Sequence, residues 1–230
     1  MSNVGLHIKS DEIISQLFPA AVRGLILPID NYLSQLNSDE FEIVRKASDK
    51  RKYEFSTGRW CAKQLLPQHV QNKTSILSGE HREPVWPKTI VGSISHCKKL
   101  CGAVIADDRE IKSIGFDVET RKELKNNIAR VVCTEPEKKW LKTQTSFPYD
   151  ILVLLLFSLK ESVYKCVYQN QKIKLSFKDC IIYPDFENNT AKIQFTGKDV
   201  KRNIELRFKL TDGYIFSGAV YPAPKIHIVK

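Results

Sequence analysis

Two short stretches decide how this chain folds and where its chemistry lies: Ile114-Gly115-Phe116-Asp117-Val118-Glu119 and Phe157-Ser158-Leu159-Lys160-Glu161-Ser162-Val163-Tyr164-Lys165. The first predicts a strand, in which alternate side chains point to one side, so Asp117 and Glu119 share a face. The second continues the apolar run 151–157 and predicts a helix. Glu161 and Lys165 lie four residues apart on one face of that helix.

The acidic residues of the two stretches predict a metal site. Two carboxylates from the strand, Asp117 and Glu119, and one from the helix, Glu161, supply the oxygen ligands that Mg²⁺ prefers; water and phosphate oxygens complete its shell. The neighbouring Lys160 and Lys165 suit a phosphate ester. Each feature alone is more often a solvated strand end or a surface ion pair, so the prediction depends on their combination. Together they indicate phosphate transfer.

Composition limits the class of protein without choosing a function. The chain has 230 residues, enough for one large domain or two lobes of roughly 100 residues each. Its 36 basic against 26 acidic residues give a net charge of +10, which favours an anionic partner of some kind. No secretory signal or membrane-spanning run is evident, and six scattered cysteines without a CxxC pair indicate reduced thiols. We therefore expect a cytoplasmic protein that does not enter membranes.

The sequence pattern predicts helices and strands in two similar halves. Residues 1–37 read as irregular. A helical pattern follows. Asn37 caps its start, with Glu40 three positions on in capping-box spacing, and Pro67 ends it. Gly58, inside this pattern, marks a kink or a break between two helices. Short strands and a mostly helical stretch make up the rest: strands at 90–95, 101–106 and 113–119, helix at about 123–169, and strands at 174–183, 191–196, 204–210 and 214–221. The strand sequences 101–106 and 217–222 resemble one another, which suggests an internal repeat.

Further residues suit the recognition of a phosphorylated nucleotide. Arg51 and Arg59 lie eight residues apart, on roughly one helix face, and two guanidiniums together suit a phosphomonoester. Ser95 and His96 end a predicted strand whose small side chains let a phosphate approach the backbone. The loop 82–87, Arg-Glu-Pro-Val-Trp-Pro, is stiff enough to form the wall of a pocket for a flat base. Taken singly, these features also fit a solvated helix face, a structural histidine and a packed tryptophan.

Taken in order, these blocks resemble the phosphopantetheinyl transferases of the surfactin and enterobactin synthase type. The resemblance covers about residues 45–168. Four motifs carry it: Arg51-Lys52 with Phe55-Ser56-Thr57-Gly58-Arg59, then 82–87 with 91–97, then 114–119, then 157–165. Departures from the family pattern are small and fall on Phe116, Phe157 and Leu159. Within this type, the chain resembles the enterobactin branch, whose members are enterobactin synthase component D-like.

The resemblance implies a fold and a reaction. The fold expected is α+β, with two pseudo-symmetric lobes, mostly antiparallel sheets and the active site between them. We expect residues 1–120 to form an N-terminal lobe with coenzyme A-binding elements, and residues 121–230 a C-terminal lobe with the catalytic helix. Such a monomeric enzyme moves phosphopantetheine from coenzyme A to a serine of an apo carrier protein, with Mg²⁺ or Mn²⁺, and releases adenosine 3',5'-bisphosphate. The carrier would be an acidic acyl, aryl or peptidyl carrier of siderophore, other nonribosomal peptide or polyketide synthesis.

The same resemblance assigns roles. Asp117, Glu119 and Glu161 would hold the metal, and Glu161, or a water that it orients, would take the proton from the carrier serine. Lys165 would stabilise the pyrophosphate and the leaving group, and Lys160 would do the same or brace the metal carboxylates. The remaining residues, which would grip the ribose phosphate or line its pocket, are Arg51, Arg59, His96, Arg82 and Ser95. Two alternatives stay open: a basic nucleic-acid-binding protein and an inactive scaffold that binds coenzyme A.

Overall fold

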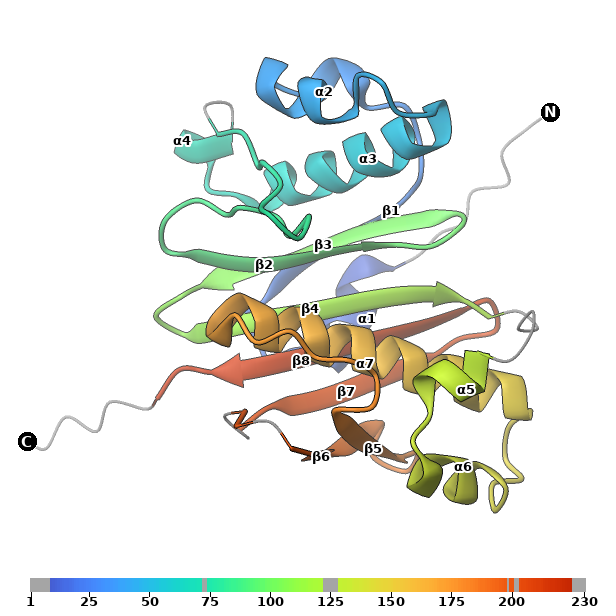
Figure 1. Ribbon diagram of the computed structural model, residues 1–230. Coiled ribbons are helices and arrows are strands. Elements are labelled where there is room, and N and C mark those ends of the chain that lie inside the picture. Colours follow the sequence, from blue (N-terminus) through green and yellow to red (C-terminus); the bar gives the residue numbers. More distant parts are fainter. Residues whose placement is uncertain (1–8, 72–73, 122–127, 198, 201–202, 225–230) are drawn as a thin grey trace, which may run out of the picture.

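The computed structural model describes residues 9–71, 74–121, 128–197, 199–200 and 203–224 (Figure 1). Two antiparallel sheets lie one above the other, and each has a long helix packed on it. This arrangement confirms the predicted α+β class. None of the helices in the described part of the chain combines the length and the apolar character that crossing a membrane requires.

The smaller sheet has three strands in the order β1-β3-β2. They are β1 (Arg23–Pro28), β2 (Ile90–His96) and β3 (Leu100–Asp107). Helix α3 (Asp49–Leu65) packs on this sheet and buries Cys61 and Ala62 against Ala103 and Ile105. Strand β3, with small side chains in its centre, is buried along most of its length, as expected for the middle strand of a covered sheet.

The larger sheet has five strands in the order β4-β8-β7-β6-β5. Its strands are β4 (Ile111–Thr120), β5 (Cys180–Asp185), β6 (Thr190–Phe195), β7 (Glu205–Leu210) and β8 (Tyr214–Pro222). Helix α7 (Tyr149–Gln171) lies across one face, and α1 (Ser10–Leu17) packs against β7 and β8. The shorter helices are η1 (Leu33–Gln35), α2 (Ser38–Val44), α4 (Gln68–Gln71), α5 (Ile128–Val132) and α6 (Glu135–Leu141).

Small residues bring α7 unusually close to β4 and β8. A Cβ atom on Gly115 of β4 would lie 1.8 Å from the backbone oxygen of Ser162, so only glycine fits there. Ser158 and Ser162 both face Ser217 of β8, with hydroxyl separations of 2.8 and 2.7 Å. These buried contacts fix the position and rotation of the helical turn that carries Glu161.

The structure confirms most predicted elements and corrects three. The strand expected at 174–183 begins only at Cys180, as β5. The three strands predicted in the first half are β2, β3 and β4, and Asn37 and Glu40 form the expected capping box of α2. The N-terminal region is not irregular throughout, because it contains α1 and β1. Gly58 does not break a helix either. It lies inside α3, and a Cβ there would meet Ile94, while the break falls between α2 and α3.

The predicted lobe boundary at residue 120 stays a prediction. Strand β4, which belongs to the first 120 residues, pairs with β8 as the edge of the larger sheet. It also contacts β2, so β4 joins the two halves of the molecule. This position places the end of β4, with its acidic pair, beside both sheets.

Candidate active site

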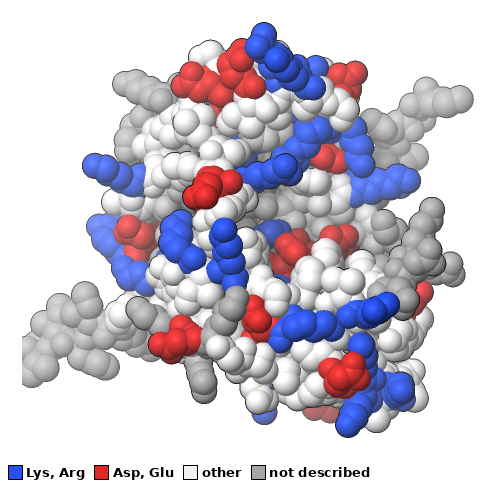
Figure 2. Space-filling model, in the orientation of Figure 1, with Lys and Arg blue, Asp and Glu red and all other residues white. Residues whose placement is uncertain are grey.

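A cavity of about 320 Å³ opens where β2, β4, α3 and α7 meet. Nine of the ten residues predicted from the sequence line it: Arg51, Arg59, Arg82, Ser95, His96, Asp117, Glu119, Glu161 and Lys165. In Figure 2, acidic and basic side chains lie close together around the hollow across the middle of the molecule. The fold thus brings together side chains from four separate motifs.

Asp117 and Lys165 form the polar floor of the cavity. The Asp117 side chain accepts at Oδ1 from Lys165 Nζ at 2.8 Å and from Ser95 Oγ at 2.7 Å. Lys165 Nζ also donates to Phe116 O and to Ser95 Oγ. Asp117 is 3% exposed, and its second oxygen, Oδ2, is buried and has no hydrogen-bond partner among the described residues. A buried carboxylate oxygen left in this state favours a cation or a donor from outside the chain.

Glu161 faces the same cavity one helical turn before Lys165. Its burial raises the pKa of the carboxyl above its usual value; Lys165 opposes this shift and Asp117 adds to it. A raised pKa brings a carboxylate closer to the range in which a general base works at neutral pH. Glu119, two residues beyond Asp117 on β4, lines the cavity as well. The three predicted acidic residues therefore share one cavity.

These carboxylates fit a magnesium ion that a phosphate ligand completes. Within the described residues, no three acidic, histidine or cysteine side chains are already gathered as a closed metal site. Mg²⁺ does not need one, because it is usually bound by one or two carboxylates together with waters and substrate phosphates. The unpartnered Asp117 Oδ2 and the nearby Glu119 and Glu161 supply that chemistry.

The other end of the cavity is basic. Arg51 Nη1 lies 3.2 Å from His96 Nε2, and both side chains are close to the carboxylate of Glu54, at 3.7 and 3.8 Å. Burial lowers the pKa of His96; Glu54 opposes the shift, and Arg51 and Lys165 add to it. His96 is therefore suited to meet a phosphate as a neutral hydrogen-bond donor, with Arg51 supplying the charge.

Arg59 reaches the cavity from inside the protein. Its Nε donates to Ile76 O at 2.6 Å, and its guanidinium stacks on Phe55 at 4.3 Å. Burial lowers its pKa to about 10, so it keeps its positive charge at neutral pH. Arg82 lines the cavity from a tight turn, where its φ of 65° is in the left-handed region. The guanidinium of Arg59 is thus fixed by the distant Ile76 carbonyl.

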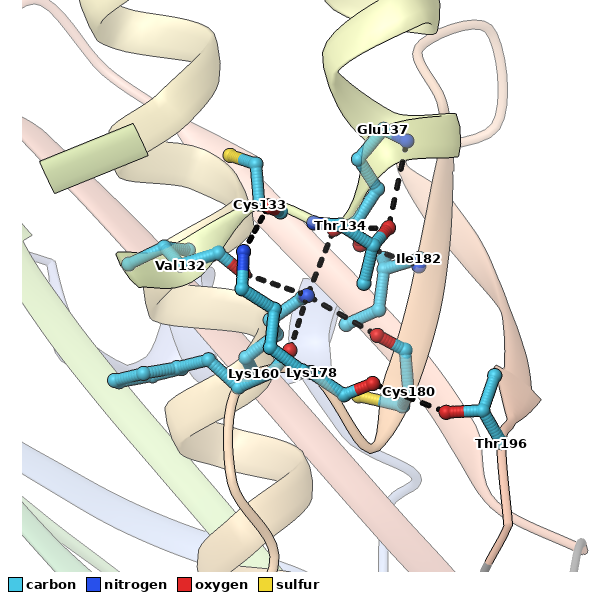
Figure 3. Close-up of polar contacts among 10 residues, drawn as sticks. Val132, Cys133, Thr134, Glu137, Lys160, Lys178, Cys180, Ile182 and Thr196 are labelled. Carbon is cyan, nitrogen blue, oxygen red and sulfur yellow. Dashed lines mark hydrogen bonds and ion pairs between the residues drawn. The ribbon is translucent and has the colours of Figure 1, made fainter. Parts of the chain in front are cut away.

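Lys160 is the one predicted site residue that the structure places elsewhere. Its side chain points away from this cavity into the interior beneath α6, where its Nζ is 2.8 Å from Glu137 Oε2 (Figure 3). The reason is its position on α7: Glu161 and Lys165 share a face, and the neighbouring Lys160 lies on another.

The cavity also contains residues that the sequence analysis did not select. They are Glu54, Ser78, Ile94, Phe55 and Phe157, whereas Pro84 comes from the loop 82–87 that was expected to form a pocket wall. Glu54 was identifiable, because it lies three residues after Arg51 on the same helix face. Ser78 was not, because it reaches the site through a loop that only the tertiary fold positions.

Two family descriptions match this chain, whose fold places carboxylates and basic side chains around one cavity. The 4'-phosphopantetheinyl transferase N-terminal domain matches residues 39–106, and the 4'-phosphopantetheinyl transferase superfamily matches residues 113–217. The chain belongs to the 4'-phosphopantetheinyl transferase superfamily and is an enzyme of that class.

Curated relatives agree with this assignment. The chain is 31% identical to 4'-phosphopantetheinyl transferase Npt of Nocardia iowensis, over 78% of this chain and 80% of the relative. It is 30% identical to 4'-phosphopantetheinyl transferase Svp of Streptomyces mobaraensis, over 85% and 82% respectively. Enterobactin synthase component D of Salmonella typhimurium is 34% identical over 65% of this chain and 57% of its own length. The family resemblance predicted from the four motifs is therefore confirmed.

Proposed function

We propose that this enzyme transfers phosphopantetheine from coenzyme A to a serine of an apo carrier protein. The observation that carries the proposal is the cavity itself, which has a basic end at Arg51 and His96 and an acidic floor at Asp117 and Glu161. Coenzyme A has a matching charge pattern, with a 3'-phosphate at one end of the nucleotide and a pyrophosphate at the other. Membership of this transferase superfamily argues against the alternative that the chain is a nucleic-acid-binding protein.

The basic end binds the nucleotide. Arg51 and His96 hold the 3'-phosphate, and the buried Arg59 adds a fixed positive charge. Arg82 and Ser95 line the same pocket, and Pro84 and Ile94 provide apolar surface for the adenine. Glu54 holds Arg51 and His96 near each other, so these two donors are arranged before the substrate arrives.

The acidic floor carries out the transfer. Asp117, Glu119 and Glu161 would hold Mg²⁺, which when bound would supply positive charge to offset the negative charge that develops on the pyrophosphate. Glu161 accepts the proton of the carrier serine, directly or through a water, as its oxygen attacks the β-phosphorus of coenzyme A. Lys165 stabilises the departing adenosine 3',5'-bisphosphate. Lys160 has no part in these steps.

A second cavity supports the choice of substrate. It has a volume of about 300 Å³ and shares Glu161 with the first, and Tyr164, Leu175 and Phe177 give it apolar walls. Lys160 also lines it, but its Nζ is bound to the carbonyls of Phe177 and Cys180. The pantetheine arm of coenzyme A is neutral and is joined to the pyrophosphate, so it needs an apolar channel next to a charged site. We place the pantetheine arm there, with the reacting phosphorus at the junction by Glu161.

The charge of the chain and the names of its relatives indicate the partner and the setting. A net charge of +10 suits an acidic carrier protein, and the relatives named for enterobactin synthesis favour a siderophore or another nonribosomal peptide or polyketide carrier. The six cysteines are all buried and free, which suits a reducing compartment such as the cytoplasm. We propose that the enzyme works as a monomer, with Mn²⁺ able to replace Mg²⁺.

A comparison of two nucleotides tests the binding mode. Calorimetry with coenzyme A and with 3'-dephospho-coenzyme A should show about tenfold or more weaker binding of the second, because hydrogen bonds to charged groups are lost. In Arg51→Gln the difference should largely disappear. Equal affinity of the wild-type enzyme for the two nucleotides would contradict the proposed orientation.

A further inference from the structure

The buried ion pair of Lys160 and Glu137 has a counterpart in the other half of the molecule. Lys63 of α3 pairs with Glu40 of α2 at 2.5 Å, and Lys160 of α7 pairs with Glu137 of α6 at 2.8 Å. The glutamates are 0% exposed, and the lysines are 7% and 1% exposed. In both pairs, 23 residues separate the lysine from its glutamate.

The two glutamates accept equivalent hydrogen bonds. Each is the third residue of a short helix and closes a capping box, with Asn37 in one half and Thr134 in the other. The second carboxylate oxygen then accepts from a distant backbone N–H at 2.8 Å, that of Ile76 for Glu40 and of Ile182 for Glu137. Each carboxylate thus ties a short helix to a segment far along the chain.

The two lysines also donate to equivalent backbone carbonyls. Lys63 Nζ donates to Gln35 O at 3.2 Å, and Lys160 Nζ donates to Val132 O at 2.9 Å. In each case 28 residues separate the lysine from that carbonyl. Lys160 makes two more bonds, to the carbonyls of Phe177 and Cys180 (Figure 3). A cation surrounded by a carboxylate and three carbonyls has no free donor for a phosphate.

We infer that Lys160 is a positioning residue, and that the lysine–glutamate unit is a device, present once in each half, that fixes the long helix of that half. A role in the chemistry would be needed once, whereas the unit occurs twice. In the C-terminal half it fixes the turn of α7 that bears Glu161. In the N-terminal half Ile76 links the unit to Arg59, because its N–H is bound by Glu40 and its carbonyl by Arg59 Nε.

The two units therefore act on different parts of the reaction. The inference rests on the proposed function for this division, since it assigns Glu161 to catalysis and Arg59 to nucleotide binding. Disturbing the C-terminal unit is expected to lower kcat, and disturbing the N-terminal unit to raise KM for coenzyme A. If Lys160 bound phosphate instead, its loss would raise KM for coenzyme A.

A pair of substitutions separates these roles. Lys160→Met leaves a buried carboxylate without its cation, which should lower Tm by roughly 10 °C. Measured at 15 °C on folded protein, kcat should fall about tenfold while KM for coenzyme A stays within about twofold. Adding Glu137→Gln removes the stranded charge and keeps an acceptor for the Ile182 N–H, but it loses the acceptor for the Thr134 N–H, so Tm and kcat should both recover in part. Lys139→Met, at an exposed position of α6, is the matched control and should change neither.

The outcomes are distinct. A KM for coenzyme A raised tenfold or more in Lys160→Met, and not restored by Glu137→Gln, would show that Lys160 binds the substrate and would overturn the inference. An unchanged kcat together with a lowered Tm would overturn the positioning role. For Lys63→Met, alone and with Glu40→Gln, the effect and its recovery should fall on KM. The Tm values test the ion pairs even if the wild-type protein transfers nothing, in which case the proposed function fails separately.

Discussion

Lys165 Nζ lies 2.8 Å from Asp117 Oδ1, at the floor of the cavity where the metal and the pyrophosphate are proposed to bind. The pair is largely buried, so the ammonium offsets much of the cost of removing the carboxylate from water. It leaves the other carboxylate oxygen, Oδ2, without a partner among the described residues. Lys165 thus acts as a resident cation beside the proposed metal ligand.

Replacing this resident cation should change metal and nucleotide binding in opposite directions. In Lys165→Gln, Asp117 keeps its negative charge without the ammonium, so Mg²⁺ should bind the nucleotide-free protein several-fold more tightly. Coenzyme A should bind about tenfold more weakly, because the pyrophosphate loses a charged donor. Calorimetry measures both, with Lys139→Gln as the control. Weaker Mg²⁺ binding in Lys165→Gln would contradict this account.

Glu161→Gln should lower the transfer activity and raise the stability of the folded protein. The neutral side chain cannot accept the serine proton, so transfer should fall at least about 100-fold while coenzyme A still binds. The folded protein holds the proton of Glu161 more tightly than the unfolded chain, because burial raises its pKa. Stability from this group is therefore lost as pH rises through the window from the usual glutamate pKa to the raised one.

The substitution should consequently raise Tm at pH 8, where the buried carboxylate is charged, and the gain should shrink toward pH 4.5. Thermal melts in the presence of a chelator measure this effect without metal. A Tm for Glu161→Gln that lies below the wild-type value at pH 8 would mean that the carboxylate is stabilised in the fold.

Gly115→Ala should damage the fold itself. The added methyl would lie 1.8 Å from a backbone oxygen of α7, so the helix must move or β4 must bend, at a cost of about 3 kcal/mol or more. Denaturant unfolding measures the loss. Gly213→Ala is the matched control, since a Cβ there meets nothing within 4 Å and the substitution should change stability by less than about 1 kcal/mol. Equal stability of the two variants would refute the close approach of α7 to β4.

The sequence was informative where local pattern and structure agree. Strand β4 and helix α7 carry strong periodic patterns, and their acidic residues share a cavity because alternation and helical spacing fix which side chains face it. Helix α1 was missed, although Asp11 and Glu12 lie in its first turn and Ile13, Ile14 and Leu17 give it a buried face. It is short, and its packing against β7 and β8 depends on strands nearly 200 residues away.

Lys160 shows a different limit. Its position beside Glu161 in the motif suggested phosphate chemistry, yet the side chain points the other way and pairs with Glu137. One signal was available: Thr134 and Glu137 repeat the capping-box spacing of Asn37 and Glu40 at the same distance before a lysine. Its meaning emerges only when the two halves are compared as folded units.

The most direct test of the central claim is the mass of a carrier protein after reaction. The purified enzyme is incubated with coenzyme A, Mg²⁺ and an apo peptidyl carrier protein, and the carrier is weighed intact. The account predicts that the carrier gains one phosphopantetheine, that a chelator prevents the gain, and that Glu161→Gln nearly abolishes it. No gain on several peptidyl, aryl and acyl carriers, despite coenzyme A binding, would contradict the account and favour an inactive scaffold.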